Sequence, residues 1–308
     1  MGNIFQFAWE VRLIESIQGL IKAAPFLKTV FSFFTMLGES TPIVLIIMFV
    51  YLCINKKIGI KIAINSLVAM GIVSMVKNVF KRIRPYAVNE SIECLKIVEK
   101  GYDLNDMSKQ GFSFPSGHSA ISSSFFQSVY LELKNKTTLI VGLTIVFAIC
   151  LSRIALGVHY PTDVLTGMFI GFVTPVILDK LDNLLSKKVY YLAIILFVSI
   201  GTFYCKSNDY YSVLGLLLGF TSGDLFEEKY VQFENTHNII KMILRIAGAA
   251  VIFLGISGLL KMPFSAEVLE AHNSFAYLYR VFRYAISSFA VFGLYPILIK
   301  KNIFKLKD

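Results

Sequence analysis

The chain has 308 residues, of which 56% are hydrophobic and 16% are charged, and its mean hydropathy is +0.66. One soluble core cannot hide that much apolar surface, so the composition predicts an all-α polytopic membrane protein, a bundle of transmembrane helices. The formal net charge is +10, but the basic residues lie in short clusters between apolar runs. That pattern is typical of loops beside a membrane and excludes a nucleic-acid-binding surface as the leading interpretation.

The first forty residues differ from the rest of the chain. Residues 4–22 have apolar side chains at steps of three to four, which predicts an amphipathic helix. Trp9, the single tryptophan, suits the membrane–water boundary, but the same helix is equally compatible with packing on the transmembrane bundle. Residues 26–37 are apolar but short for a crossing, so we expect a dipping or re-entrant helix there.

Nine later segments are expected to cross the membrane. Lysines are concentrated in every second connection and at the carboxyl terminus, which places the carboxyl terminus in the cytoplasm and the amino terminus outside. One basic cluster, residues 77–84, falls on the opposite side and calls for a functional explanation. The predicted spans are residues 40–55, 60–80, 116–133, 137–156, 161–180, 189–205, 210–226, 239–260 and 274–299.

Polar motifs occupy only part of the chain, which predicts three regions. Residues 1–38 form the amino-terminal helices, residues 39–185 a catalytic transmembrane core, and residues 186–308 additional transmembrane helices of unknown role. The polar connection 86–114 is the longest loop of the core, and we expect it to form a lid or rim over the site.

The first motif is basic. Lys77 and Arg84 are seven residues apart, so a helix would place both on one face. Pro85 disfavours helix at Arg84, which predicts that this side chain already points into the mouth of a site. A plainer interpretation is an interfacial cluster that reaches to lipid headgroups, and this is the role we expect for Lys81 and Arg82.

The second motif opens a long apolar helix. Ser116 is well placed as an N-cap, and the free amides that follow it form an anion site. Gly117 lets the backbone approach a phosphate closely, and His118 then stands in the first turn. The alternative is an ordinary helix start after the Phe-rich turn 112–114.

The third motif joins two predicted spans. Arg153 ends one span, and His159 and Asp163 lie on either side of the next helix start, where Pro161 suits the first position. The Asp163 carboxylate can then accept a hydrogen bond from one imidazole nitrogen of His159. The other nitrogen is left unprotonated as a nucleophile.

Together the three motifs read Lys-x6-Arg-Pro, Pro-Ser-Gly-His and Ser-Arg-x5-His-x3-Asp. This combination resembles, without a substitution, the signature of the type 2 phosphatidic acid phosphatase superfamily, which includes vanadium haloperoxidases and glucose-6-phosphatase. The resemblance covers roughly residues 60–175. The predicted topology is similar to that of the glucose-6-phosphatase and sphingosine-1-phosphate phosphatase branch.

The resemblance implies a role for each motif residue. His159 would attack phosphorus to form a phosphohistidine, Asp163 would orient it, and His118 would protonate the departing alkoxide and then activate water. The implied phosphate-binding groups are Lys77, Arg84, Ser116, Gly117 and Arg153. Three fixed cations can stabilise a transferring phosphoryl group without Mg²⁺, so we expect no metal and no cofactor.

The leading hypothesis is therefore an integral-membrane phosphatase that removes the terminal phosphate of a lipid at the extracytoplasmic face of the plasma (inner) membrane. The candidate substrates are phosphatidate, phosphatidylglycerophosphate, polyprenyl pyrophosphate and sphingoid phosphate. A phospho- or headgroup transferase and a sugar-phosphate phosphatase would use the same site. A transporter or scaffold is the non-enzymatic alternative, for which Asp224 and Arg245 inside predicted spans are the relevant charges.

Overall fold

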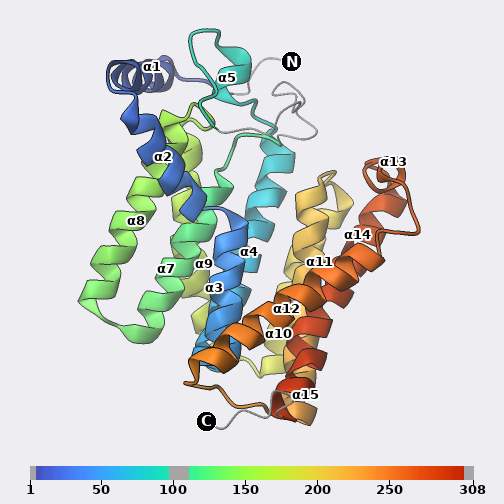
Figure 1. The fold of residues 1–308 in the computed structure, drawn as a ribbon. Helices are drawn as coiled ribbons and strands as arrows, with labels where there is room; N and C mark the ends of the chain where they lie inside the picture. Colours follow the sequence, from blue (N-terminus) through green and yellow to red (C-terminus); the bar gives the residue numbers. More distant parts are fainter. Residues whose placement is uncertain (1–4, 97–110, 302–308) are drawn as a thin grey trace. The chain divides into compact units, whose positions relative to one another are not determined.

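A computed structural model describes residues 5–96 and 111–301, and these residues form helices joined by short connections, with no strand among them (Figure 1). The predicted all-α bundle is confirmed. The helices are α1 (Ala8–Ala23), α2 (Phe26–Leu37), α3 (Ser40–Phe49), α4 (Lys56–Phe80), α5 (Pro85–Val88), α7 (Gly117–Leu133), α8 (Lys136–Ala155), α9 (Pro161–Leu184), α10 (Lys187–Ser199), α11 (Asn208–Phe226), α12 (Ile239–Leu259), α13 (Ala266–Leu269), α14 (Ser274–Phe289) and α15 (Tyr295–Lys300).

Several helices are long and apolar enough to cross a membrane, which makes this an integral membrane protein. Five segments meet that description: Lys56–Val88, Lys136–Ala155, Pro161–Leu184, Ile239–Leu259 and Ser274–Lys300. A sixth arises if α2 and the following helical segment Ser40–Ile54, bent by 47°, count as one broken span. The predicted spans at 116–133, 189–205 and 210–226 are also helical, as α7, α10 and α11, but fall outside this set.

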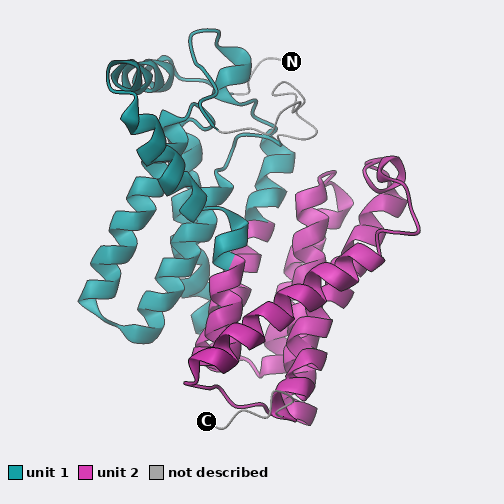
Figure 2. Ribbon diagram, in the orientation of Figure 1, with its two compact units in different colours: residues 1–43, 72–180 teal, residues 44–71, 181–308 magenta. Residues whose placement is uncertain are grey.

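The chain separates into two compact units (Figure 2). Unit 1 comprises residues 1–43 and 72–180, and unit 2 comprises residues 44–71 and 181–308. α4 belongs to both, since its first part lies in unit 2 and its last turns lie in unit 1. The three-region division expected from the motifs stays a prediction.

In unit 1, α1 packs on the other helices through one face. Its buried residues are Glu10, Ile14, Gln18 and Ile21, and Ile14 lies in a core cluster with residues of α8 and α9. Trp9, at 52% exposed, and Leu20 remain on the opposite face. The interpretation that this helix packs on the bundle is confirmed, and a place at the membrane boundary for its exposed apolar face stays a prediction.

The start of α9 packs closely on the start of α7. A Cβ placed on Gly167 would lie 2.4 Å from the carbonyl oxygen of Ser116, and one on Gly171 would lie 2.4 Å from that of Ala120. Only glycine allows two helix backbones to approach so closely, and this small-xxx-small spacing is common between membrane helices.

Unit 2 has a core of its own, in which aromatic rings meet edge to face. Tyr51 packs against Phe220, Phe233 and Phe292 at centroid distances of 5.2–6.0 Å. The Tyr51 hydroxyl also donates to the carbonyl of Phe292 at 3.3 Å, which satisfies its polar atom inside an apolar cluster.

Candidate active site

All the predicted site residues lie in unit 1. Arg84 is the N-cap of the short helix α5, and the others lie at or near the ends of α4 and α8 and the starts of α7 and α9. The backbone joins two of these termini, since the amide of Ser116 donates to the carbonyl of Asp163 at 2.9 Å. The residues concerned are Lys77, Arg84, Ser116, Gly117, His118, Arg153, His159 and Asp163.

His159 is the centre of the arrangement and is only 2% exposed. Its Nδ1 lies 3.4 Å from Oδ2 of Asp163, and its Nε2 lies 3.5 Å from Nη1 of Arg84. Burial, followed by the positive charges of two arginines and a lysine, lowers the pKa of His159 well below its usual value. These cations are Arg84, Arg153 and Lys77. The imidazole is therefore neutral near pH 7, as a nucleophile must be.

Asp163 is fully buried and both of its oxygens are engaged. Oδ2 accepts from the hydroxyl of Ser113 and from the backbone amide of Tyr160, the latter at 2.8 Å. Oδ1 lies 2.6 Å from Nη1 of Arg82. Three groups besides the imidazole thus hold the Asp163 carboxylate in place. The helix that carries it, α9, starts at Pro161 as predicted.

Lys77 and Arg84 reach the site by different routes. One helix does not carry both, because α4 ends at Phe80, as the predicted span did, and Lys81 adopts a left-handed conformation with φ 47°. Arg84 is extended, as Pro85 predicts, and donates to the carbonyl oxygens of Gly111 and Val158 at 3.1 and 3.0 Å. The Lys77 ammonium donates to the carbonyl of Phe112.

Arg153 and His118 each present a buried donor or acceptor to the same region. Arg153 is 2% exposed and its Nη1 donates to the hydroxyl of Thr35 at 2.5 Å. Within residues 5–96 and 111–301, Nε of Arg153 and Nε2 of His118 are buried without a hydrogen-bond partner. Leaving such atoms unsatisfied is costly. Oxygen atoms of a ligand bound here would satisfy them.

The start of α7 has the predicted cap. The Ser116 hydroxyl accepts from the amide of Ser119 at 3.4 Å and from its hydroxyl at 2.9 Å. His118 is the second residue of this helix, and a Cβ on Gly38 would come within 3.4 Å of it. That distance is an ordinary contact, and the close neighbour of Gly38 is instead Ile149, whose Cγ2 would lie 2.7 Å from such a Cβ.

Arg82 is the residue that the sequence interpretation placed wrongly. It was expected to reach lipid headgroups, but it is fully buried and its guanidinium stacks on the ring of Tyr160 at 3.8 Å. The helix ends before it, and in an extended segment residues two apart share a side. Arg82 therefore points inward with Arg84, although the helix end at residue 80 was itself predicted.

Ser113 and Glu10 were also missed as site residues. Ser113 was interpreted as part of a Phe-rich turn, but its hydroxyl contacts Asp163 and lies 3.5 Å from Nδ1 of His159. Glu10 lies in α1, seventy-two residues before the arginine with which it pairs, and no local pattern marks that contact.

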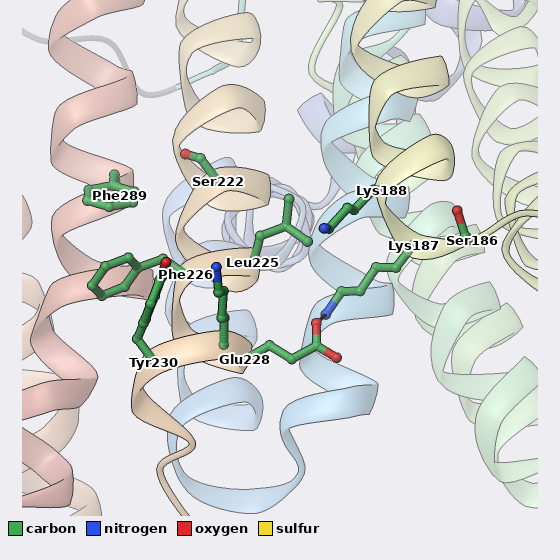
Figure 3. Close-up of a pocket in the computed structure, with 10 residues that line it drawn as sticks. Ser186, Lys187, Lys188, Ser222, Leu225, Phe226, Glu228, Tyr230 and Phe289 are labelled. Atoms are coloured by element: carbon green, nitrogen blue, oxygen red, sulfur yellow. Dashed lines mark hydrogen bonds and ion pairs between the residues drawn. The ribbon is translucent and has the colours of Figure 1, made fainter.

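Unit 2 has paired charges of its own, around the buried carboxylate of Asp224. Lys187 lies 2.6 Å from Asp224 and 2.7 Å from Glu228, and the Tyr191 hydroxyl donates to Asp224 at 2.6 Å. Figure 3 shows the Lys187 side chain extended towards Glu228 in a cavity of about 680 Å³. The cavity is lined by Ser186, Lys187, Lys188, Ser222, Leu225, Phe226, Glu228, Lys229, Tyr230 and Phe289.

These pairings support a structural interpretation of the charges in the later spans. Arg245 donates to the carbonyl oxygens of Leu52 and Glu234 at 2.7 and 2.9 Å, and Asp224 is paired as described. Among the described residues, no group of three or more His, Cys, Asp or Glu side chains could hold a metal ion.

Comparison with known proteins agrees with the motif positions. Residues 59–181 match the model of the PAP2 superfamily, and residues 211–306 match that of the PAP2 superfamily phosphatase transmembrane extension. An undecaprenyl-diphosphatase of Sulfolobus acidocaldarius is 29% identical over 117 residues, which cover 38% of this chain and about half (52%) of that relative. No solved structure matches the chain. The two family matches include all three motifs and the later helices, and the chain belongs to the PAP2 superfamily.

Proposed function

We propose that this protein is a lipid phosphate phosphatase that works through a phosphohistidine on His159. The observation that carries the proposal is the position of this imidazole, buried and neutral between Asp163 and Arg84. With its proton on Nδ1 facing the carboxylate, the ring offers the Nε2 lone pair to phosphorus. Asp163 stabilises the imidazolium that forms as the P–N bond is made.

His118 is proposed to move the protons. As Nε2 of His159 attacks, the bond from phosphorus to the leaving oxygen breaks and His118 gives that oxygen its proton. In the second half His118 takes a proton from water, which attacks the phosphohistidine and releases inorganic phosphate with restored His159. The buried Nε2 of His118 fits this role, because a reacting oxygen would become its hydrogen-bond partner.

The cations would bind the phosphoryl oxygens. Arg84, Lys77 and Arg153 all act electrostatically on His159, so they surround the point where phosphorus must bind. The proposed cradle also includes Ser116 and the amide of Gly117 at the start of α7. Fixed donors around a transferring phosphoryl group supply most of what this chemistry needs.

A membrane lipid is the proposed substrate because the site lies where long apolar helices begin and end. α8 and α9 are both long enough to cross a bilayer, and His159 lies between them. A headgroup could enter there while its acyl or prenyl chains stay in the bilayer. The lysine distribution supports an extracytoplasmic site, in the plasma (inner) membrane.

Among the candidate lipids, one observation favours a diphosphate. Lys96 is partly buried, and this burial, followed by the positive charges of Arg153 and Arg84, lowers its pKa. The preceding residue is anchored, since the Leu95 amide donates to the carbonyl of Leu156 at 3.1 Å. A further cation at this position suits a second phosphate, as in the substrate that names the undecaprenyl-diphosphatase relative.

The central test is phosphate release by the purified protein in detergent, with His159→Ala as the inactive variant. We expect the variant to lose on the order of 10³-fold or more of the activity while it still folds and inserts. His237→Ala is the matched control, since this exposed histidine lies in unit 2. Near-wild-type turnover by His159→Ala would rule out the mechanism.

A substrate panel identifies the leaving group. Phosphatidate, sphingoid phosphate, polyprenyl diphosphate and a sugar phosphate are compared in the same detergent, with and without an alcohol acceptor. Lys96→Gln should reduce diphosphate turnover more than monophosphate turnover, and Lys134→Gln, an exposed lysine at the other end of α7, should change neither. Equal losses on both lipids would count against the diphosphate. A phosphorylated alcohol formed in place of inorganic phosphate, with no phosphate released when the alcohol is absent, would indicate a transferase.

A further inference from the structure

The amino-terminal helix contributes a buried carboxylate to the candidate active site. Glu10 is fully buried, and its Oε2 lies 2.6 Å from Nη2 of Arg82. Its Oε1 accepts from the hydroxyl of Thr162 at 2.6 Å and from the amide of the same residue at 3.0 Å. Glu10 therefore contacts the first turn of α9 directly, one residue before Asp163.

Arg82 connects this carboxylate to the other acid. Its Nη1 lies 2.6 Å from Oδ1 of Asp163, and its guanidinium lies between the rings of Phe5 and Tyr160 at 4.3 and 3.8 Å. A guanidinium held between two rings and bonded at both ends has one available orientation. Glu10, Arg82 and Asp163 thus form a row of ion pairs, and the carboxylate at its end, that of Asp163, faces His159.

Stability alone is a weak explanation for this chain of charges. All three side chains are 0% exposed, and burying ions costs free energy that apolar residues of similar size would not require. Two negative charges and one positive charge leave a net charge of −1 beside the imidazole. That charge would favour the imidazolium formed during attack, and it depends on all three members.

We propose that Glu10 and Arg82 are positioning residues, which fix the orientation of Asp163 and set the negative charge that His159 experiences. The amphipathic helix α1 is then part of the active site. This inference rests on the proposed function, because it assigns the two residues to the same phosphohistidine step.

The two residues should shift the pH dependence in opposite directions. Removing the positive charge of Arg82 leaves more negative charge near His159, which favours protonation and moves the acidic limb of kcat to higher pH. Removing the negative charge of Glu10 moves it to lower pH. The other charged or titratable groups facing His159 are Lys77 from α4, Arg84 before α5, His118 from α7, Arg153 from α8 and Asp163 from α9.

The experiment measures kcat and KM against pH for Glu10→Gln, Arg82→Met and the double variant. We expect each single variant to lose about 10–100-fold in kcat, as for other residues that orient a reacting group, with a smaller change in KM. The double variant removes one charge of each sign, so its acidic limb should return towards the wild-type position. Arg82→Lys should retain the position of the limb better than Arg82→Met.

Glu15→Gln, on the same helix, is the matched control and should leave the profile unchanged. If the variants fold less well but keep the wild-type acidic limb and kcat per folded molecule, the two residues are structural and the inference is wrong. If the acidic limbs of Glu10→Gln and Arg82→Met move in the same direction, the inference is also wrong. A wild-type protein that releases no phosphate from any lipid or sugar phosphate would refute the proposed function instead.

Discussion

Arg84 and Arg153 of unit 1 have different surroundings from the paired lysines of unit 2, although Arg82 of unit 1 is itself paired with two acids. In unit 1, Arg84 and Arg153 lie close enough to influence each other and His159, and their hydrogen bonds run to backbone carbonyls and to Thr35. In unit 2, Lys56 lies 2.9 Å from the fully buried Glu227, and Lys187 pairs with two acids. Cations gathered near one another suit an anion that arrives from outside, whereas paired charges are satisfied within the protein.

The largest effect that would test this contrast is expected from Arg153→Met. Loss of one donor to the phosphoryl group should lower kcat/KM by about 10²–10³-fold. Thermal stability should stay unchanged or rise, because the substitution removes a buried positive charge close to Arg84. The measurements are phosphate release and the unfolding temperature in the same detergent. If Arg153→Met instead lowers the unfolding temperature strongly and keeps normal activity per folded molecule, Arg153 is a structural residue and the contrast with the lysines of unit 2 is wrong.

The opposite result is expected from Lys56→Met in unit 2. Glu227 is 0% exposed and would lose its charged partner, which should destabilise the protein by about 3 kcal/mol. The remaining folded protein should keep its kcat, because the pair has no role in the proposed chemistry. Lys57→Met, at an exposed neighbouring position, controls for the loss of a surface charge. If Lys56→Met lowers the kcat of the folded protein as well as its stability, the pair of Lys56 and Glu227 contributes to the reaction.

The smallest effect concerns the pH dependence of stability. The folded pKa of His159 lies below its usual 6.5, so its neutral form stabilises the fold fully above pH 6.5. As the pH falls below 6.5 the unfolded chain takes up a proton first, and stability is lost by up to about 1.4 kcal/mol per pH unit. His159→Gln should show a shallower loss, measured as unfolding temperature between pH 7 and 5. Identical slopes would mean that His159 is protonated in the folded protein.

The sequence predicted the helices and the motif positions well because both depend on local patterns. Apolar runs locate the spans, Pro85 keeps Arg84 extended, and Ser116 begins α7. The end of α4 at residue 80 was predicted too, but the direction of the side chains that follow it was not. Because α4 ends at Phe80, the segment that follows is extended and Arg82 turns inward instead of towards lipid.

The contribution of α1 could not be predicted for a different reason. Its apolar stripe indicated a face for the membrane or the bundle, and the periodicity treats Glu10 as a polar residue on the opposite face. In the structure that face is the buried one, because Arg82 and Thr162 satisfy the carboxylate. A partner seventy-two residues away leaves no trace in a local pattern.

The close packing of α7 and α9 has a consequence for the range of substrates such a site can accept. The two histidines are carried at or beside the starts of these helices, and Gly167 and Gly171 hold the two backbones in direct contact. The distance between the starts of α7 and α9, and with it the distance between His118 and His159, therefore depends on this helix packing. A side chain at Gly167 would increase that distance for every substrate alike.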